Sequence, residues 1–231
     1  PRIMEAMDQP SIDGINVWYA SKAAAKLKLK VVFSGLGGDE IFFGYNHFRN
    51  IPLIFKYLNI VKKIPFTNIL LKFLFSIYAY VKKDDRLMKI TENSRSIFDL
   101  WFLKRTILTK KNMFKEELPI NLNNFSKFYK EIEEKVNLYD FTNPKIKISY
   151  LDSIFYMKNQ LLRDSDWASM FHGVELRTPF VDAYLLSKLK DIMNSYSTLE
   201  NKESLKETFD KILPKNFLQS KKTGFQTPLK I

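Results

Sequence analysis

The chain has 231 residues, of which 45% are hydrophobic, and its 37 Lys and Arg against 25 Asp and Glu give a net charge of +12. This apolar content supports a folded core, so the composition excludes a disordered chain. The lack of cysteine excludes disulfides and thiolate metal sites, and the two histidines argue against structural zinc. The lysines are scattered along the sequence and do not form one tract, so we expect no binding to nucleic acid.

The first part of the chain predicts a helix followed by a strand. Ser11 is a candidate N-cap for a helix that reaches about Leu27, with lysines late in it, where the helix dipole favours them. The apolar run Val31–Phe33 predicts a buried, parallel strand. It stops at Ser34-Gly35-Leu36-Gly37-Gly38-Asp39-Glu40, which is typical of a strand that ends in a glycine loop before a helix. This order of elements predicts an α/β unit.

The glycine loop is the strongest indication of function. Glycines let the backbone approach a ligand, and a helix start offers N–H groups to an anion. Asp39 fits beside such a site if a cation lies between it and the anion, so the segment points to nucleotide phosphates held with Mg²⁺. The pattern is not a P-loop, a Gly-x-Gly-x-x-Gly motif or a nucleophile elbow. Taken alone, an ordinary turn with Asp39 favoured by the helix dipole is the commoner explanation.

The middle of the chain predicts several amphipathic helices. From Ile51 to about Ser126 no clear strand is indicated, and Pro52, Pro65 and Pro119 act as breakers. The most apolar stretch, Asn68–Val81, has 14 residues and contains a lysine, which is too short for a membrane span. We predict a buried helix there, with an interfacial helix as the alternative.

The remainder of the chain predicts helices joined by polar loops. The helices are Tyr129–Val136, about Lys147 to His172 with Gly173 as its end, Ala183–Met193 and Lys202–Lys211; the loops are 121–124, 143–144, Val174–Asp182 and Lys221–Phe225.

Three segments carry an unusual density of polar residues. The glycine loop is the first. Arg163–Asp166, followed by Glu175, Arg177 and Asp182, is the second, and Lys221–Phe225 is the third. Singly, each has a structural explanation: capping acids, an ion-pair set that pins a loop, or a surface lysine.

Together, the three segments resemble the asparagine synthetase family. Residues 33–45 (FSGLGGDEIFFGY) resemble its second signature, Ser-Gly-x-Gly-x-Asp-Glu followed by an apolar pair and Gly-Tyr. Residues 162–182 resemble a later block of the family, and Lys222-Thr223-Gly224-Phe225-x-x-Pro228 resembles its C-terminal Lys-x-Gly-Phe element. The order and the spacing of the three agree along most of the chain.

The resemblance implies the synthetase domain of a glutamine-dependent amidotransferase, with an adenine-nucleotide α-hydrolase-like fold and an ATP-pyrophosphatase site. Such a domain activates a carboxylate as an acyl-adenylate and releases pyrophosphate before ammonia attacks. The resemblance therefore implies ATP and Mg²⁺ as cofactors and a cytoplasmic carbon–nitrogen ligase like asparagine synthase (glutamine-hydrolysing). Its implied substrates are ATP, aspartate and ammonia, which an N-terminal glutaminase domain releases from glutamine. A homodimer is the oligomeric state to test.

The resemblance also places the nucleotide site on the glycine loop. Ser34, Gly35, Leu36 and Gly37 match the residues that line the ATP and substrate pocket. Asp39 matches the carboxylate that binds Mg²⁺.

The resemblance assigns the catalytic roles to Lys222 and Glu175. Lys222 matches the lysine that stabilises charge on the α-phosphate and on the intermediate, and adenylation builds up such charge. Glu175 lies in a segment that resembles a wall of the pocket.

Two departures from the family pattern bear on function. The first phosphate loop, Ser-Gly-Gly-x-Asp-Ser, is absent, so we expect residues 1–231 to be a synthetase domain incomplete at its N-terminus and inactive alone. We expect that loop and the glutaminase domain upstream of Pro1. Leu36 stands where asparagine synthetases carry Glu, which leaves open another carboxylate, such as a cell-surface sugar or peptide precursor, or another amine. A non-catalytic nucleotide-binding module is the alternative from a different class.

Overall fold

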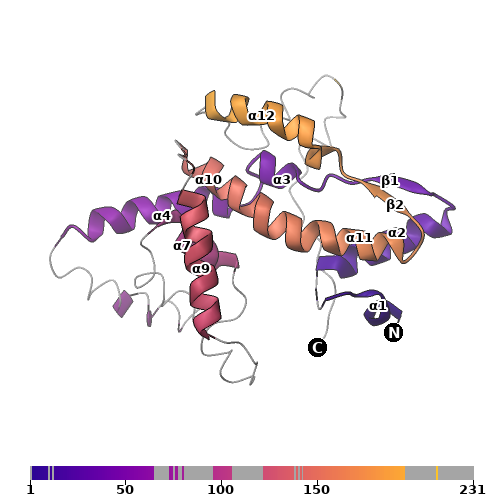
Figure 1. Cartoon of the computed structure of the whole chain (residues 1–231), viewed down its shortest axis with the longest axis horizontal. Helices are drawn as coiled ribbons and strands as arrows, with labels where there is room; N and C mark the ends of the chain where they lie inside the picture. The colour runs from indigo at the N-terminus through magenta and orange to yellow at the C-terminus, as the bar shows by residue number, and fades with distance from the viewer. Residues whose placement is uncertain are drawn as a thin grey trace. The chain divides into compact units, whose positions relative to one another are not determined.

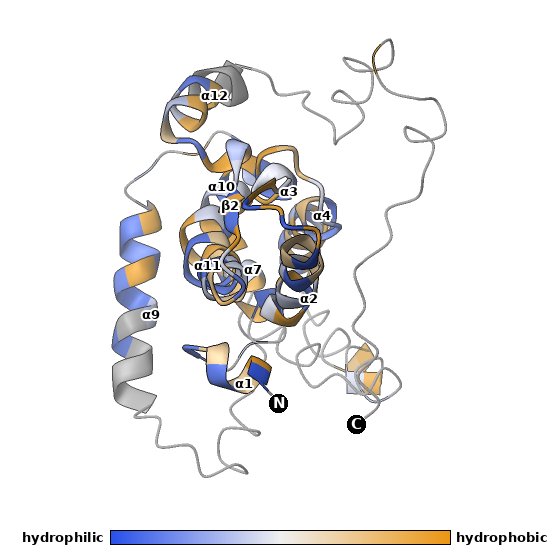
Figure 2. Ribbon diagram, turned by 90° about the vertical axis from the view of Figure 1, so that its right-hand side faces the viewer, coloured by the Kyte–Doolittle hydropathy of each residue, from blue (hydrophilic) through white to orange (hydrophobic). Residues whose placement is uncertain are grey.

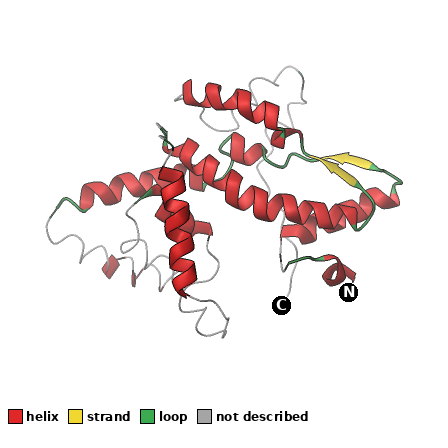
Figure 3. Cartoon of the chain, in the orientation of Figure 1, coloured by secondary structure: helices red, strands yellow, loops and turns green. Residues whose placement is uncertain are grey.

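The computed structural model describes residues 2–9, 11, 13–64, 96–105, 122–137 and 143–195, together with single positions at 73, 74, 76, 77, 80, 139, 141 and 212. This part of the chain is mostly helical and contains one sheet of two parallel strands, which matches the predicted α/β class (Figure 3). The chain divides into two compact units, Pro1–Tyr45 with Ser149–Ile231, and Asn46–Ile148. A single synthetase domain over the whole chain stays a prediction.

The first unit holds the segments on either side of the glycine loop. Its elements are α1 (Arg2–Ala6), α2 (Asp13–Lys26), β1 (Val31–Phe33), α3 (Gly38–Ile41), the π-helix η2 (Asp152–Leu162), α11 (Arg163–Met170), β2 (Glu175–Arg177), the 3₁₀-helix η3 (Pro179–Val181) and α12 (Ala183–Ser195). Figure 1 shows η2 and α11 as one continuous helical rod beside α2.

The core of this unit lies between α2 and α11. Trp18 of α2 and Trp167 and Ala168 of α11 are buried together, and apolar residues of α1 pack against them. Such burial of indole rings supplies much of the apolar area that a small core needs.

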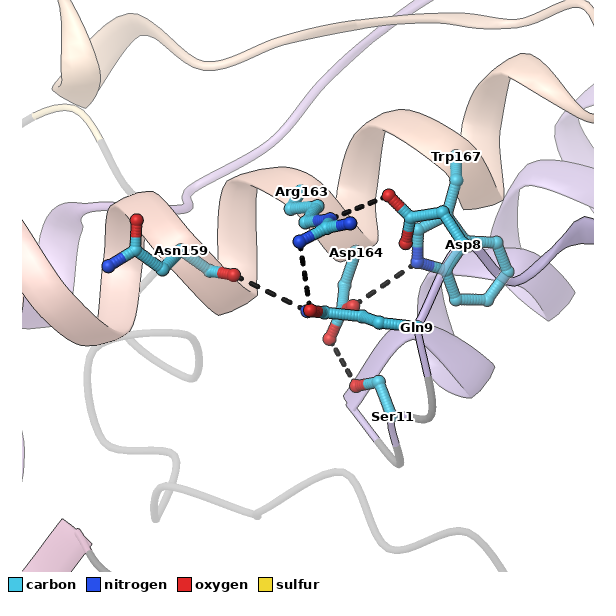
Figure 4. A network of polar contacts seen from close by, with 7 residues as sticks. All are labelled: Asp8, Gln9, Ser11, Asn159, Arg163, Asp164 and Trp167. Atoms are coloured by element: carbon cyan, nitrogen blue, oxygen red, sulfur yellow. Dashed lines mark hydrogen bonds and ion pairs between the residues drawn. The ribbon is translucent and has the colours of Figure 1, made fainter. Parts of the chain in front are cut away.

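A polar network joins the segment before α2 to η2 and α11. Figure 4 shows its members, Asp8, Gln9, Ser11, Asn159, Arg163, Asp164 and Trp167. Arg163 Nε donates to Asp8 Oδ2 at 2.6 Å on the surface. Asp164 is buried and accepts hydrogen bonds from the Trp167 indole at 3.2 Å and from the Ser11 hydroxyl. The network therefore fixes the chain that leads into α2.

The second unit contains α4 (His47–Val61), α7 (Ile97–Arg105), α9 (Leu122–Asn137) and most of α10 (Pro144–Leu151), which runs directly into η2. Asp99 of α7 is buried and accepts from the Tyr129 hydroxyl of α9. Figure 2 shows hydrophilic and hydrophobic residues interleaved in the coloured part of α9, where Ile132 and Val136 are buried. No helix in the described parts of the chain is long and apolar enough to cross a membrane.

Several predicted elements are confirmed. The strand Val31–Phe33 is β1 and is parallel to β2 as predicted, but it is not buried as predicted, because Val31 is 38% and Phe33 74% exposed in the two-stranded sheet of the described residues. The long helix predicted to end before Gly173 is the continuous run of α10, η2 and α11. Gly173 takes a φ of 64°, and the Val174 N–H donates to Ser169 O at 3.2 Å, which closes the helix end as predicted.

Other predictions of local structure are wrong. The segment predicted as the loop Val174–Asp182 contains β2, which pairs with β1, because pairing with a distant strand overrides a weak local pattern. The predicted loop at 121–124 is wrong from Leu122 on, where α9 begins. Pro52 does not break a helix, since α4 runs through it. Ser11 does not cap a helix, since α2 begins at Asp13 and the serine hydroxyl serves a buried carboxylate.

Some predictions fall largely on residues that are not described. Most of Asn68–Val81 is among these, and the four large apolar side chains described there are exposed instead of buried: Phe73, Leu74, Ile77 and Tyr80. An apolar sequence alone does not establish that a helix is buried, because burial depends on which other elements pack against it. The predicted helix Lys202–Lys211 and the loop Lys221–Phe225 also lie outside the described residues.

Candidate functional site

The glycine loop leaves the sheet at the carboxyl ends of both strands. Ser34 follows β1 directly, and its N–H donates to Arg177 O at 2.8 Å, so it extends the pairing of β1 with β2 by one step. Because the strands are parallel, the segments after Phe33 and after Arg177 leave at the same edge. Ligands of open α/β sheets bind outside the carboxyl ends of the strands, so the loop occupies the favoured position.

The loop is held by its own hydrogen bonds. The Ser34 hydroxyl accepts from the Leu36 N–H at 3.2 Å, and Gly35 O accepts from the Gly38 N–H at 3.1 Å. Gly37 takes a φ of 89°, a left-handed conformation that glycine adopts without strain. The helix start predicted after the loop is present as α3, which has only four residues and is therefore a single helical turn.

Packing distinguishes the glycines of the loop. A Cβ at Gly37 would lie 2.8 Å from Val181 Cγ2, and one at Gly38 would lie 3.4 Å from the Phe180 ring. These two positions are therefore covered by η3. Gly35 differs, because a Cβ there would meet nothing within 4 Å. The open side of the loop is at Gly35, where a ligand can approach the backbone.

Asp39 lies in the first turn of α3, directly after the loop. Its side chain is half-buried and its Oδ1 atom is buried, while its carbonyl accepts from the Gly44 N–H at 2.8 Å. Among the described residues, no group of three or more His, Cys, Asp or Glu is arranged to hold a metal ion. Mg²⁺ commonly takes one or two carboxylates and completes its shell with phosphate oxygens and water. A single carboxylate such as that of Asp39 is compatible with that arrangement.

Glu40, the next residue, is buried inside the unit. Its side chain is 1% exposed, and its Oε1 accepts from the Tyr45 hydroxyl at 3.0 Å. Burial raises the pKa of Glu40, and the nearby carboxylates of Asp152 and Asp39 raise it further, against the opposing effect of its hydrogen bonds. Burial likewise raises the pKa of Tyr45, which therefore stays protonated and donates its hydrogen bond.

Of the two predicted catalytic residues, Glu175 is among the described residues and Lys222 is not. Glu175 begins β2 opposite Val31, at the amino end of the strand pair and thus away from Ser34. Its Oε1 accepts from Arg177 Nε at 2.8 Å, and both side chains are 56% exposed, so the structure brings Glu175 to an arginine and not to the glycine loop. Lys222 lies outside the described residues, and both catalytic roles stay predictions.

Sequence reasoning missed the residues that hold the loop. Phe180 packs edge-on against Phe42 with ring centroids 5.8 Å apart, and it covers the loop from the η3 side. The Ser149 hydroxyl donates to Glu40 O at 2.7 Å and thereby holds the helical turn that follows the loop. For the contact of Phe180 with Phe42, the only local indication in the sequence is the Pro-Phe-Val run before Asp182. For the hydrogen bond from Ser149 to Glu40, the sequence gives no local indication.

The comparisons with known proteins agree with the resemblance. The family model described as asparagine synthase matches residues 1–231. The chain is 26% identical over 238 aligned residues to "Asparagine synthetase [glutamine-hydrolyzing] 1" of Bacillus subtilis (strain 168), which covers all of this chain and 36% of that protein. The chain thus spans about a third of the length of this curated relative. No solved structure matches it. Since the family model covers the whole chain, the chain belongs to the asparagine synthase family.

Proposed function

We propose that this chain is the synthetase part of an ATP-dependent amide-forming ligase with an adenine-nucleotide α-hydrolase-like fold. One observation carries the proposal: in a chain matched throughout by the asparagine synthase model, a glycine loop open at Gly35 lies at the carboxyl ends of two parallel strands, with Asp39 beside it. That position suits a nucleotide whose phosphates approach the loop backbone.

The proposed reaction has two steps. A carboxylate oxygen attacks the α-phosphorus of ATP, which forms an acyl-adenylate and expels pyrophosphate. An amine then attacks the acyl carbon, which gives the amide, AMP and a proton. Bound Mg²⁺ would offset the growing charge on the phosphates, and Asp39 is the residue we assign to hold it. Lys222 is assigned to the charge on the α-phosphate, since a preorganised cation stabilises that charge most in the transition state.

The default acceptor is aspartate, and the default nitrogen source is ammonia released from glutamine. The name of the Bacillus subtilis relative includes glutamine hydrolysis, and most of that protein lies outside the region that matches this chain. We therefore assign glutamine hydrolysis and the first phosphate loop to the remainder of a longer, cytoplasmic protein. Leu36 is uncharged at a position that the family uses for Glu, which favours testing other carboxylates and other amines.

The test uses the full-length protein with ATP and Mg²⁺. Pyrophosphate release is measured with aspartate and ammonium or glutamine, and then with sugar acids and peptide carboxylates in place of aspartate. Release that depends on one of these carboxylates, with the amide as product, is the expected result. Tight Mg²⁺·ATP binding without pyrophosphate release for any acceptor would reject the ligase and leave a nucleotide-binding module.

A further inference from the structure

Glu40 is held by hydrogen bonds to both its side chain and its backbone. Its carboxylate accepts from the Tyr45 hydroxyl at 3.0 Å, and its carbonyl accepts from the Ser149 hydroxyl at 2.7 Å. With 1% of its surface exposed, it is among the most buried side chains of the described residues. A buried acid costs desolvation free energy that an apolar side chain of similar size would avoid. The pair with Tyr45 therefore calls for an explanation other than stability.

The helix that carries Glu40 is a single turn, and a helix this short is marginal without tertiary contacts. α3 has four residues, and it begins after Gly37, whose left-handed backbone would otherwise act as a hinge. Successive residues in a helix are about 100° apart around the axis, so fixing the side chain of Glu40 fixes the direction of Asp39. On its other side the loop is covered by Phe180 and Val181. The Glu40–Tyr45 bond thus fixes the side chain of this helical turn, in addition to the contacts with η3 and the bond from Ser149 to the Glu40 carbonyl.

We propose that Glu40 and Tyr45 are positioning residues. They orient α3 so that the Asp39 carboxylate faces the open side of the glycine loop at Gly35, where we place the nucleotide phosphates. This inference rests on the proposed function for its consequence, the binding of Mg²⁺ with a nucleotide. The orientation of the loop itself does not depend on that function. Neither residue needs to touch the substrate.

The chain offers a matched control in its other unit. Tyr129 also donates its hydroxyl to a buried carboxylate, that of Asp99, but between α7 and α9. Tyr45→Phe and Tyr129→Phe therefore remove the same kind of hydrogen bond from two places. Glu40→Gln is the conservative second variant, because it keeps an oxygen that accepts from Tyr45 and nearly the same volume.

The experiment uses the full-length protein and two readouts. Hydrogen–deuterium exchange measures the opening of the segment 34–44, and calorimetry measures the Mg²⁺ concentration needed for half-maximal ATP binding. For Tyr45→Phe we expect exchange in that segment and the required Mg²⁺ concentration both to rise by about threefold to tenfold, the effect of one hydrogen bond. Tyr129→Phe should change neither, and Glu40→Gln should lie close to the wild type.

The outcomes separate the two proposals. If the wild type binds no Mg²⁺·ATP, the proposed function fails, while the exchange readout still tests the orientation of α3. If Tyr45→Phe leaves exchange in the segment 34–44 equal to that of Tyr129→Phe, the positioning role is overturned. Faster exchange with an unchanged Mg²⁺ requirement would overturn it as well, because the bond would then be structural only. Should Tyr45→Phe fail to fold, Glu40→Leu compared with Glu40→Gln gives the same decision.

Discussion

The indole of Trp167 lies against the backbone of Gly14, so closely that a Cβ built on Gly14 would come within 2.2 Å of Trp167 Cζ2. The contact joins α11 to α2 in the core of the first unit, and both residues are buried there. The ring has little freedom to move, because its N–H donates to the buried Asp164. Gly14 is thus kept small by a neighbour that lies 153 residues away in the chain.

Gly14→Ala should therefore destabilise the protein. Gly14 is the second residue of α2, so alanine gains less here than the roughly 1 kcal/mol it gains over glycine in a helix interior. Overpacking a core costs about 1–3 kcal/mol, and a contact of 2.2 Å belongs at the upper end of that range. We expect a net loss of about 1–2 kcal/mol in the free energy of unfolding, measured by urea denaturation. A net gain would show that the indole shifts at little cost.

Gly35→Ala should separate stability from binding. A Cβ at Gly35 meets nothing within 4 Å, so the free energy of unfolding should change by less than about 0.5 kcal/mol. The methyl group would nevertheless project from the open side of the loop, where we place the nucleotide. We expect weaker ATP binding in the full-length protein by calorimetry.

Gly37→Ala is the counterpart of that variant. It places a side chain on a left-handed backbone and 2.8 Å from Val181 Cγ2, so it should lower stability as well as binding. If Gly35→Ala bound ATP as well as the wild type, the open side of the loop would not be the nucleotide side.

Asp39→Asn should remove the dependence of ATP binding on Mg²⁺ and abolish adenylation, while the protein stays folded. The amide keeps the volume of the side chain but is a weaker ligand for a hard cation. Chelation of Mg²⁺ from the wild type should reproduce the loss. Pyrophosphate release measured across a Mg²⁺ titration checks this, and an unchanged titration curve would leave Asp39 as a helix-start residue only.

Lys222→Ala should lower kcat by 10²–10³-fold, the effect expected from the loss of one preorganised charge stabiliser, and change KM for ATP much less. Lys221→Ala is the control, because it removes the same charge from the neighbouring position, to which the resemblance assigns no role. The comparison is made with the full-length protein under saturating acceptor. Small and equal effects of both variants would reject the catalytic role of Lys222.

The sequence predicted the parts of this site that are local and missed those that depend on distant contacts. The glycine loop and β1 follow from a run of consecutive residues, because turn chemistry and apolar β-branched runs are local signals. β2 has three residues, and only its pairing with β1 makes it a strand. Ser149, which supports Glu40 from 109 residues away, has no local pattern that could announce it.

His172 should make the stability of the protein sensitive to acid. Its ring packs 4.6 Å from the ring of Trp18 and 5.2 Å from that of Phe171, both edge to face. Burial lowers the pKa of His172, the positive charge of Lys22 lowers it further, and a hydrogen bond with the Trp18 backbone opposes the two. The folded state therefore favours the neutral imidazole more than the unfolded chain does.

The sign of the pH dependence follows from that preference. The stabilisation is complete above about pH 6.5, the ordinary pKa of histidine, and it is lost as the pH falls through the lowered pKa of the folded state. His172→Gln should flatten the decline in the free energy of unfolding between about pH 7 and 5. Lys22→Gln should make the decline shallower without removing it, because the repulsion between the two cations disappears while the burial remains. Urea denaturation at each pH measures all three proteins, and equal slopes for the wild type and His172→Gln would exclude His172 as a source of the acid sensitivity.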